Sequence, residues 1–215
     1  MQNILVVGGS SGIGFELTKL LAQNSNRVYA TYHKTIRESS DDLISYHALN
    51  VLEENITLDF LHDVLDGFVY CPGSINLKPF ARIKSEEFET DFALNVSGAV
   101  KILQLVLPRL KKSDQASVIF FSTVAVQLGL NFHAQVAASK GAIEGLTRAL
   151  AAEFAPAIRV NCIAPSLTET NLSASLLNTP EKRETGVQRH PLKGQERLMT
   201  WRKWQHFFYQ KNHRG

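Results

Sequence analysis

The stretch Ile4–Gly14, with the sequence ILVVGGSSGIG, constrains the fold of this chain more than any other. A short apolar run ends in a glycine-rich turn with Gly8, Gly12 and Gly14, and apolar residues at helical spacing follow at once: Ile13, Leu17, Leu20 and Leu21. This pattern predicts a buried strand, a tight turn and the start of a helix. A helix start presents unpaired backbone N–H groups and the positive end of its dipole. The turn is therefore a predicted binding site for a phosphate or pyrophosphate.

Length and composition indicate a single soluble domain of the α/β class. The 215 residues are 44% hydrophobic and 20% charged, which suffices for one full-sized core. No apolar run reaches membrane-spanning length and the N-terminus reads as a strand, so we expect neither a membrane partner nor a signal peptide. Cys71 and Cys162 lie in apolar runs typical of buried free thiols. Free thiols are typical of a reducing compartment, so we expect a cytoplasmic location. We predict no metal site.

The net charge of +3 comes from residues 195–215. That stretch contains five Lys/Arg and one acid, a net +4, so the rest of the chain carries −1. The basic balance therefore says nothing about the folded domain, and we expect no nucleic-acid partner.

Strand-like and helix-like patterns alternate along the chain. After the first strand and helix, strands are predicted at Arg27–Tyr32, Leu43–Leu49, Gly67–Tyr70, Ser117–Ser122 and Arg159–Ile163. Helices are predicted at Ile56–Leu65, over most of Phe80–Leu110 and at Ala134–Phe154. This alternation predicts a doubly wound parallel sheet in a three-layer α/β/α architecture.

Five segments together resemble the short-chain dehydrogenase/reductase family, over residues 1 to about 193. In chain order they are GGSSGIG at Gly8–Gly14, YCPG at Tyr70–Gly73 where the family has Asn-Asn-Ala-Gly, LNVSG around Asn95, FFSTVA around Ser122-Thr123, and RVNCIAPSLTET at Arg159–Thr170. The last resembles the family's Pro-Gly-x-x-x-Thr segment, with Ser166 in place of the glycine. The resemblance implies a Rossmann-like fold and an NAD(P)-dependent oxidoreductase that acts on a small carbonyl or alcohol.

The resemblance also implies roles for particular residues. It assigns catalysis to Asn95, Ser122, Thr123 and Lys140. It assigns cofactor binding to Gly8, Ser10, Ser11, Gly12, Ile13, Gly14, His33, Lys34, Asn50, Val51, Gly73, Lys140, Pro165, Leu167 and Thr170. The glycines would hold the pyrophosphate, Lys140 the nicotinamide ribose and Thr170 the carboxamide. A substrate cannot be read from these residues.

The end of the second predicted strand, Tyr32-His33-Lys34, bears on the choice of cofactor. Enzymes selective for NAD usually place an acid there to bind the ribose 2′-hydroxyl, and this chain has none. His33 and Lys34 are better suited to a 2′-phosphate, so we predict a preference for NADP over NAD.

The chain departs from the family at its proton donor. In the family a tyrosine stands four residues before the lysine and a serine thirteen residues before that tyrosine; here the two positions hold Val136 and Thr123. Valine has no proton to give, and general acid–base catalysis contributes about 10²–10⁴ in rate. His133, three residues before Val136, is an alternative donor that would titrate near neutrality. Tyr70 is interpreted as a packing residue.

The stretch after Lys193 lacks the family's last helix and last strand. Read one base out of register, its codons permit the family's residues R-x-G-T-P-x-D-L-A-E-M, so we interpret residues 194–215 as an atypical tail produced by a frameshift and residues 1–193 as the domain. A purposeful basic and aromatic amphipathic helix is the alternative. The frameshift hypothesis predicts that the last strand is missing and that Arg159–Ile163 forms a sheet edge.

Two further functions stay open beside the oxidoreductase. Val136 favours a dinucleotide-binding protein without turnover, and the tail favours an inactive truncated product. The family resemblance also implies a homodimer through the two long helices, Phe88–Leu110 and Ala134–Phe154.

Overall fold

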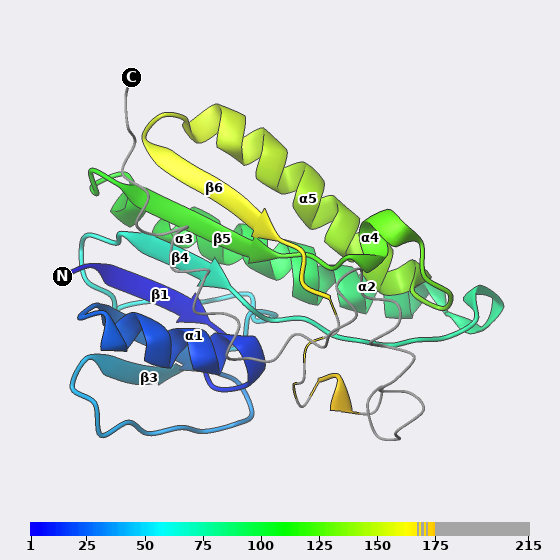
Figure 1. Cartoon of the computed structure of the whole chain (residues 1–215), viewed down its shortest axis with the longest axis horizontal. Coiled ribbons are helices and arrows are strands. Elements are labelled where there is room, and N and C mark those ends of the chain that lie inside the picture. The colour runs from blue at the N-terminus through cyan, green and yellow to red at the C-terminus, as the bar shows by residue number, and fades with distance from the viewer. Residues whose placement is uncertain (167, 169, 171, 175–215) are drawn as a thin grey trace.

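The computed structural model describes residues 1–166, 168, 170 and 172–174, and its centre is a wholly parallel six-stranded sheet (Figure 1). The strands are β1 Asn3–Val7, β2 Arg27–Tyr32, β3 Ile44–Ala48, β4 Gly67–Tyr70, β5 Ala116–Phe121 and β6 Ile158–Ile163. Their order is β3-β2-β1-β4-β5-β6, so the chain builds outward from β1 in one direction and then in the other. The predicted doubly wound α/β fold is confirmed.

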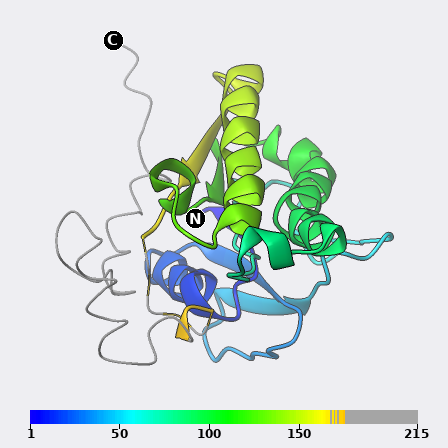
Figure 2. The same cartoon turned by 90° about the vertical axis from the view of Figure 1, so that its right-hand side faces the viewer.

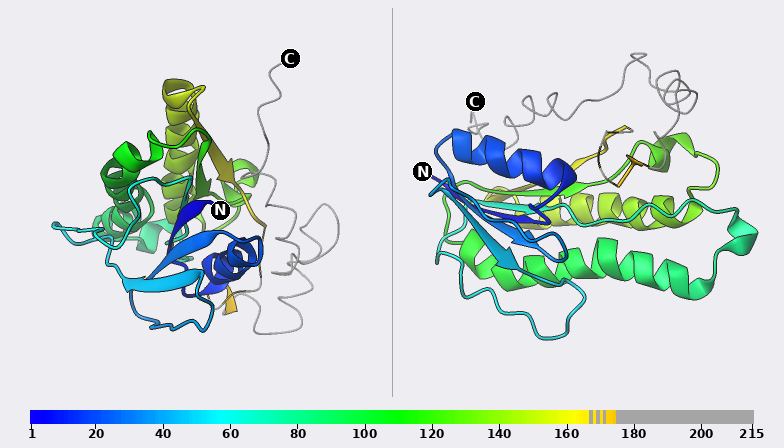
Figure 3. Two further views of the ribbon diagram at one scale, coloured as in Figure 1. Left: turned by 90° about the vertical axis from the view of Figure 1, so that its left-hand side faces the viewer. Right: turned by 90° about the horizontal axis from the view of Figure 1, so that it is seen from below.

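Helices cover both faces of the sheet in three layers, as the view from below in Figure 3 shows. Helix α1, Gly12–Gln23, lies on one face, and helices α3, Gly98–Leu110, and α5, Ala134–Phe154, lie on the other. Alternate residues of β1 point to opposite faces: Leu5 and Val7 pack under α3 and α5, while Ile4 and Val6 pack under α1. The fold therefore has two separate apolar cores.

The predicted helix over Phe80–Leu110 is largely confirmed, with an interruption that the sequence pattern does not show. A 3-10 turn, Phe80–Arg82, precedes α2, Ser85–Phe92; a π-helical segment, Ala93–Ser97, then joins α2 to α3. The continuous helix Ser85–Leu110 is long and apolar enough, at a mean hydropathy of 1.2, to cross a membrane, contrary to our reading of the sequence. In this fold it is a core helix, because Ile102, Val106 and Leu110 are fully buried against the sheet.

The predicted helix at Ile56–Leu65 is wrong. The chain from β3 to β4 contains no helix; Leu61 N–H bonds back to the Leu58 carbonyl, and Leu65 N–H bonds to the Arg109 carbonyl at the end of α3. Leu58, Leu61 and Leu65 are nonetheless buried. A ten-residue stretch is marginal as a helix, and here irregular backbone buries the same side chains.

One other difference is local. A four-residue helix, α4 Ala125–Leu128, follows β5 and ends at Gly129 in the left-handed region (φ 63°). Among the described residues the sheet ends at β6. The boundary at residues 193–194 and the tail lie outside the described residues.

Candidate active site

The proposed site residues gather where the strands end. All six strands are parallel, so their carboxyl ends meet at one edge, which faces the viewer in Figure 2. The strand order reverses between β1 and β4, and a crevice at such a point is the usual ligand site of open α/β sheets.

The glycine turn after β1 has the backbone that an anion site requires. Gly8 and Gly12 adopt positive φ angles of 76° and 52°, and a Cβ on Gly14 would lie 2.3 Å from the Gly8 carbonyl oxygen. Ser11 is the N-cap of α1, yet its side chain makes no capping hydrogen bond, and the first turn of the helix carries no acid. The N–H groups at the start of α1 are thus left to a ligand.

Several other predicted residues lie in or near the glycine turn. Ser10 is buried and Ile13 half-buried beside it. Thr170, in the segment after β6, lies against the turn: its Cγ2 is 3.5 Å from a Cβ built on Gly12. The Pro165 carbonyl accepts a hydrogen bond from Val124 N–H (3.2 Å), which ties the segment after β6 to the segment after β5. Leu167 lies outside the described residues.

Gly73, Asn95 and Lys140 form a second cluster. A Cβ on Gly73 would lie 3.2 Å from Asn95 Oδ1 and 3.4 Å from Lys140 Nζ, so the bare glycine lets both side chains approach the loop after β4. Asn95 is fully buried inside the π-helical segment, and its Nδ2 donates to the Asp91 carbonyl (2.9 Å). Its Oδ1 has no partner among the described residues. Segments of π-helix and unsatisfied buried acceptors are both typical of functional sites.

Lys140 has an unusual electrostatic environment. Burial lowers the pKa of its ammonium group to about 8, although Cys162, Asp91 and Cys71 act in the opposite direction. Burial also raises the pKa of the Cys71 thiol to about 12 and raises the pKa of Cys162. Both cysteines are free, as predicted, and their thiols are neutral near pH 8.

The residues near the proton-transfer position differ in what they can offer. Ser122 is buried and donates its hydroxyl to Glu144 Oε1 (2.6 Å), while half-buried Thr123 accepts from Ala125 N–H (3.3 Å) at the start of α4. Val136, one turn before Lys140 in α5, is 6% exposed. Of the two hydroxyls, that of Thr123 is the one not given to a carboxylate.

The alternative proton donors lie in different surroundings. Tyr70 is buried and donates its hydroxyl to the Leu94 carbonyl (2.6 Å), and burial raises its pKa, so its packing role is supported. His133 is the N-cap residue of α5, and its Nδ1 lies 2.7 Å from the Asn131 carbonyl oxygen.

The predicted adenosine-side residues are only partly assembled. His33 and Lys34 are exposed, Asn50 accepts a hydrogen bond from Leu52 N–H (3.1 Å), and Val51 is buried against Gly98. Sequence reasoning missed Arg37. Its Nε donates to the Ser10 carbonyl (2.8 Å), and its guanidinium lies 4.0 Å from the centre of the Phe15 ring. No motif marks Arg37, because it stands in an irregular loop.

These features define a dinucleotide-binding protein of the doubly wound α/β class. The family model of short chain dehydrogenases matches residues 2–181, and the chain belongs to that family. A tropinone reductase homolog of Arabidopsis thaliana is 30% identical over 211 residues, covering 89% of this chain and 78% of the relative. A 3-oxoacyl-[acyl-carrier-protein] reductase of Thermotoga maritima is 30% identical over 206 residues, covering 87% and 82%. The predicted family and oxidoreductase class are thus confirmed.

Solved structures share the fold at lower identity. The NADP complex of ElxO superposes with a TM-score of 0.85 at 20% identity, covering 99% of this chain and 93% of that one. The NADP complex of RhlG from Pseudomonas aeruginosa gives a TM-score of 0.87 at 24% identity, covering 94% and 87%.

Proposed function

We propose that this oxidoreductase binds a nicotinamide dinucleotide along the carboxyl edge of its sheet. The observation that carries the proposal is the joint placement of the glycine turn, Thr170 and the Gly73–Asn95–Lys140 cluster at that edge. The uncapped start of α1 suits the pyrophosphate, and the Lys140 ammonium suits the ribose hydroxyls of the nicotinamide half. When bound, the nicotinamide supplies or accepts the hydride for a carbonyl or alcohol substrate.

We further propose that the chain prefers NADP(H) to NAD(H). The support is the group Lys34, His33 and Arg37, in which Arg37 Nε donates to the Ser10 carbonyl of the glycine turn. Arginine and lysine suit a phosphate, whereas the 2′-hydroxyl of NAD usually meets a carboxylate.

Calorimetry with both cofactors tests this preference. We expect Arg37→Gln and Lys34→Ala each to weaken NADPH binding by about tenfold, as one charge-assisted contact warrants, and to leave NADH binding within about twofold. Lys112→Ala, at the far end of α3, is a matched control. Equal losses for both cofactors would contradict the 2′-phosphate assignment. Failure of both cofactors to bind would contradict the proposed function itself.

A dinucleotide-binding protein without turnover is the second candidate. Val136 supports it, since a buried aliphatic side chain occupies the position one turn before Lys140 and offers no proton. The assay that separates the two candidates is NADPH oxidation with a panel of ketones and quinones at saturating cofactor.

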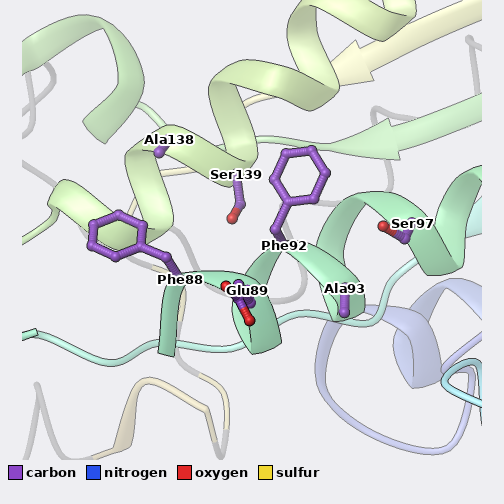
Figure 4. A pocket seen from close by; sticks show the side chains of 7 residues that line it. All are labelled: Phe88, Glu89, Phe92, Ala93, Ser97, Ala138 and Ser139. Carbon is purple, nitrogen blue, oxygen red and sulfur yellow. The ribbon is translucent and has the colours of Figure 1, made fainter. Parts of the chain in front are cut away.

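We also propose that the protein forms a homodimer through the two long helices and that it is located in the cytoplasm. A groove of about 380 Å³ lies between the continuous helix and α5; its lining is mostly apolar (Figure 4): Phe88, Glu89, Phe92, Ala93, Ser97, Ala138 and Ser139. Phe92 is 44% exposed there, and a two-fold partner would bury it against the same patch. Light scattering should report a dimer that Phe92→Asp converts to a monomer, while Phe132→Asp, at an exposed phenylalanine before α5, leaves it intact.

A further inference from the structure

Asp91 is a buried carboxylate that the assignments above leave without a role. It lies near the end of α2 at 4% exposure, and no described cation lies within 4 Å of its carboxylate. Two hydroxyl groups donate hydrogen bonds to the carboxylate instead: Ser74 Oγ donates to Oδ1, and Ser139 Oγ donates to Oδ2 (2.6 Å). Taking a carboxylate out of water is costly unless hydrogen bonds and an opposite charge compensate, so the position requires an explanation.

The side chains that donate hydrogen bonds to Asp91 belong to the Gly73–Asn95–Lys140 cluster or stand next to it in the sequence. Ser74 follows Gly73, Ser139 precedes Lys140, and Asn95 itself donates to the Asp91 backbone carbonyl (2.9 Å). One residue thereby ties the loop after β4, the π-helical segment and α5 together. Figure 4 shows Ser139 projecting from α5 toward the helix that carries Asp91.

We propose that Asp91 is a positioning residue that holds this cluster together and keeps Lys140 in its charged form. The proposal rests on the proposed function in one respect, that Lys140 binds the cofactor ribose. Ser74 and Ser139 donate to the two carboxylate oxygens and Asp91 is only 4% exposed, so the carboxylate is held in place beside the cluster.

The charges around Lys140 support this role. Cys162 from β6, Cys71 from the loop after β4 and Asp91 from α2 act on it. Burial keeps both thiols neutral, and Glu144, one turn further along α5, is engaged by Ser122 and by Arg148 at 4.0 Å. Cys162, Asp91 and Cys71 all oppose the desolvation of Lys140, and Asp91 is the carboxylate among them.

The direction of the expected shift follows. Burial holds the pKa of Lys140 at about 8, and Asp91 raises it toward the usual range. Removal of the Asp91 charge therefore lowers the pKa of Lys140, and the loss of one nearby opposite charge is worth about one unit. At pH 8 the variant would hold a mostly neutral amine, which donates more weakly to ribose hydroxyls.

Direct titration of Lys140 tests the proposal without any cofactor. In protein labelled with ¹³C-lysine, the Cε resonance lost in Lys140→Met identifies Lys140. We expect Asp91→Asn to lower its midpoint by about one unit. Asp66→Asn is the matched control, because Asp66 also accepts a serine hydroxyl (Ser113 Oγ, 2.7 Å) but lies at the opposite end of the sheet. The Lys140 midpoint in this variant should equal that of the wild type. An unchanged midpoint in Asp91→Asn overturns the proposal.

A second measurement keeps the proposal testable if Asp91→Asn fails to fold. In wild-type protein labelled with ¹³C-aspartate, one Cγ resonance should show an inflection at the Lys140 midpoint that Lys140→Met abolishes. Its absence refutes the coupling.

NADPH affinity across pH 6–10 then connects the residue to binding. We expect the alkaline loss of affinity to move down with the Lys140 midpoint in Asp91→Asn, giving a roughly tenfold weaker affinity at pH 9. A merely structural role would weaken binding equally at every pH. If the midpoint shifts but the wild type binds no NADPH, the proposed function fails while the role of Asp91 stands.

Discussion

Replacement of Val136 by tyrosine should create a proton donor at the one position where the site lacks it. Residues at i and i+4 of a helix lie about 5–6 Å apart at Cβ on the same face, so a tyrosine at Val136 would stand over Lys140. The Lys140 ammonium lies beside Gly73 and Asn95, at the carboxyl edge of the sheet. The new hydroxyl would therefore lie beside Lys140, where we expect a substrate oxygen to bind.

The expected gain in reaction rate and the expected loss of folding free energy each have a typical magnitude. One general acid contributes about 10²–10⁴ in rate, which corresponds to roughly 2.7–5.5 kcal/mol of activation free energy. Val136 is only 6% exposed, so the added ring costs about 1–3 kcal/mol of folding free energy by overpacking. The gain applies to the chemical step and the cost to stability, and separate measurements resolve them.

The assay is NADPH oxidation with a generic ketone, run beside urea unfolding. Val136→Phe is the matched control, since it adds the same ring without the hydroxyl. We expect Val136→Tyr to raise turnover at least tenfold over both the wild type and Val136→Phe. A rise of equal size in Val136→Phe would refute the general-acid argument. Strong activity of the wild type would point to another donor, and His133→Ala should then abolish it.

Three further outcomes follow from single contacts. Gly14→Ala should prevent stable folding of the turn or abolish NADPH binding, as seen by circular dichroism and calorimetry, because its Cβ would clash with the Gly8 carbonyl. Phe68→Ala, at a fully buried site, should cost about 3–5 kcal/mol in urea unfolding. Tyr70→Phe should cost about 1 kcal/mol in the same measurement by freeing the Leu94 carbonyl, and should leave NADPH affinity unchanged.

The sequence predicted helix α5 and the glycine-rich unit accurately. Helix α5 has the predicted bounds Ala134–Phe154, and the β1–turn–α1 unit follows directly from its apolar run and glycines. The region from Ile56 to Leu65 shows the limit of this reasoning, because apolar spacing reports burial and not the backbone that achieves it.

The candidate site likewise contains residues that sequence motifs predict and residues that they do not. Motifs located Gly14, Asn95 and Lys140, whose places are fixed by regular elements. Asp91 and Arg37 carry no motif: Asp91 reads as part of a solvated helix face, and Arg37 stands in a loop whose path is set by its contacts with Ser10 and Phe15. The sequence pattern does not predict the π-helical segment either, since its residues fit an α-helix equally well.

The division of the interior into two cores has a consequence for how the protein opens. The core under α1 is the smaller one, and α1 can detach from it while β1 stays paired with β2 and β4. Amide hydrogens of α1 should therefore exchange with solvent through a local opening of lower free energy than those of α5. A ligand held at the start of α1 would slow that exchange selectively, by about 2.7 kcal/mol of protection at a hundredfold excess over its Kd. Hydrogen exchange along this chain would thus reveal an occupied site in a single helix.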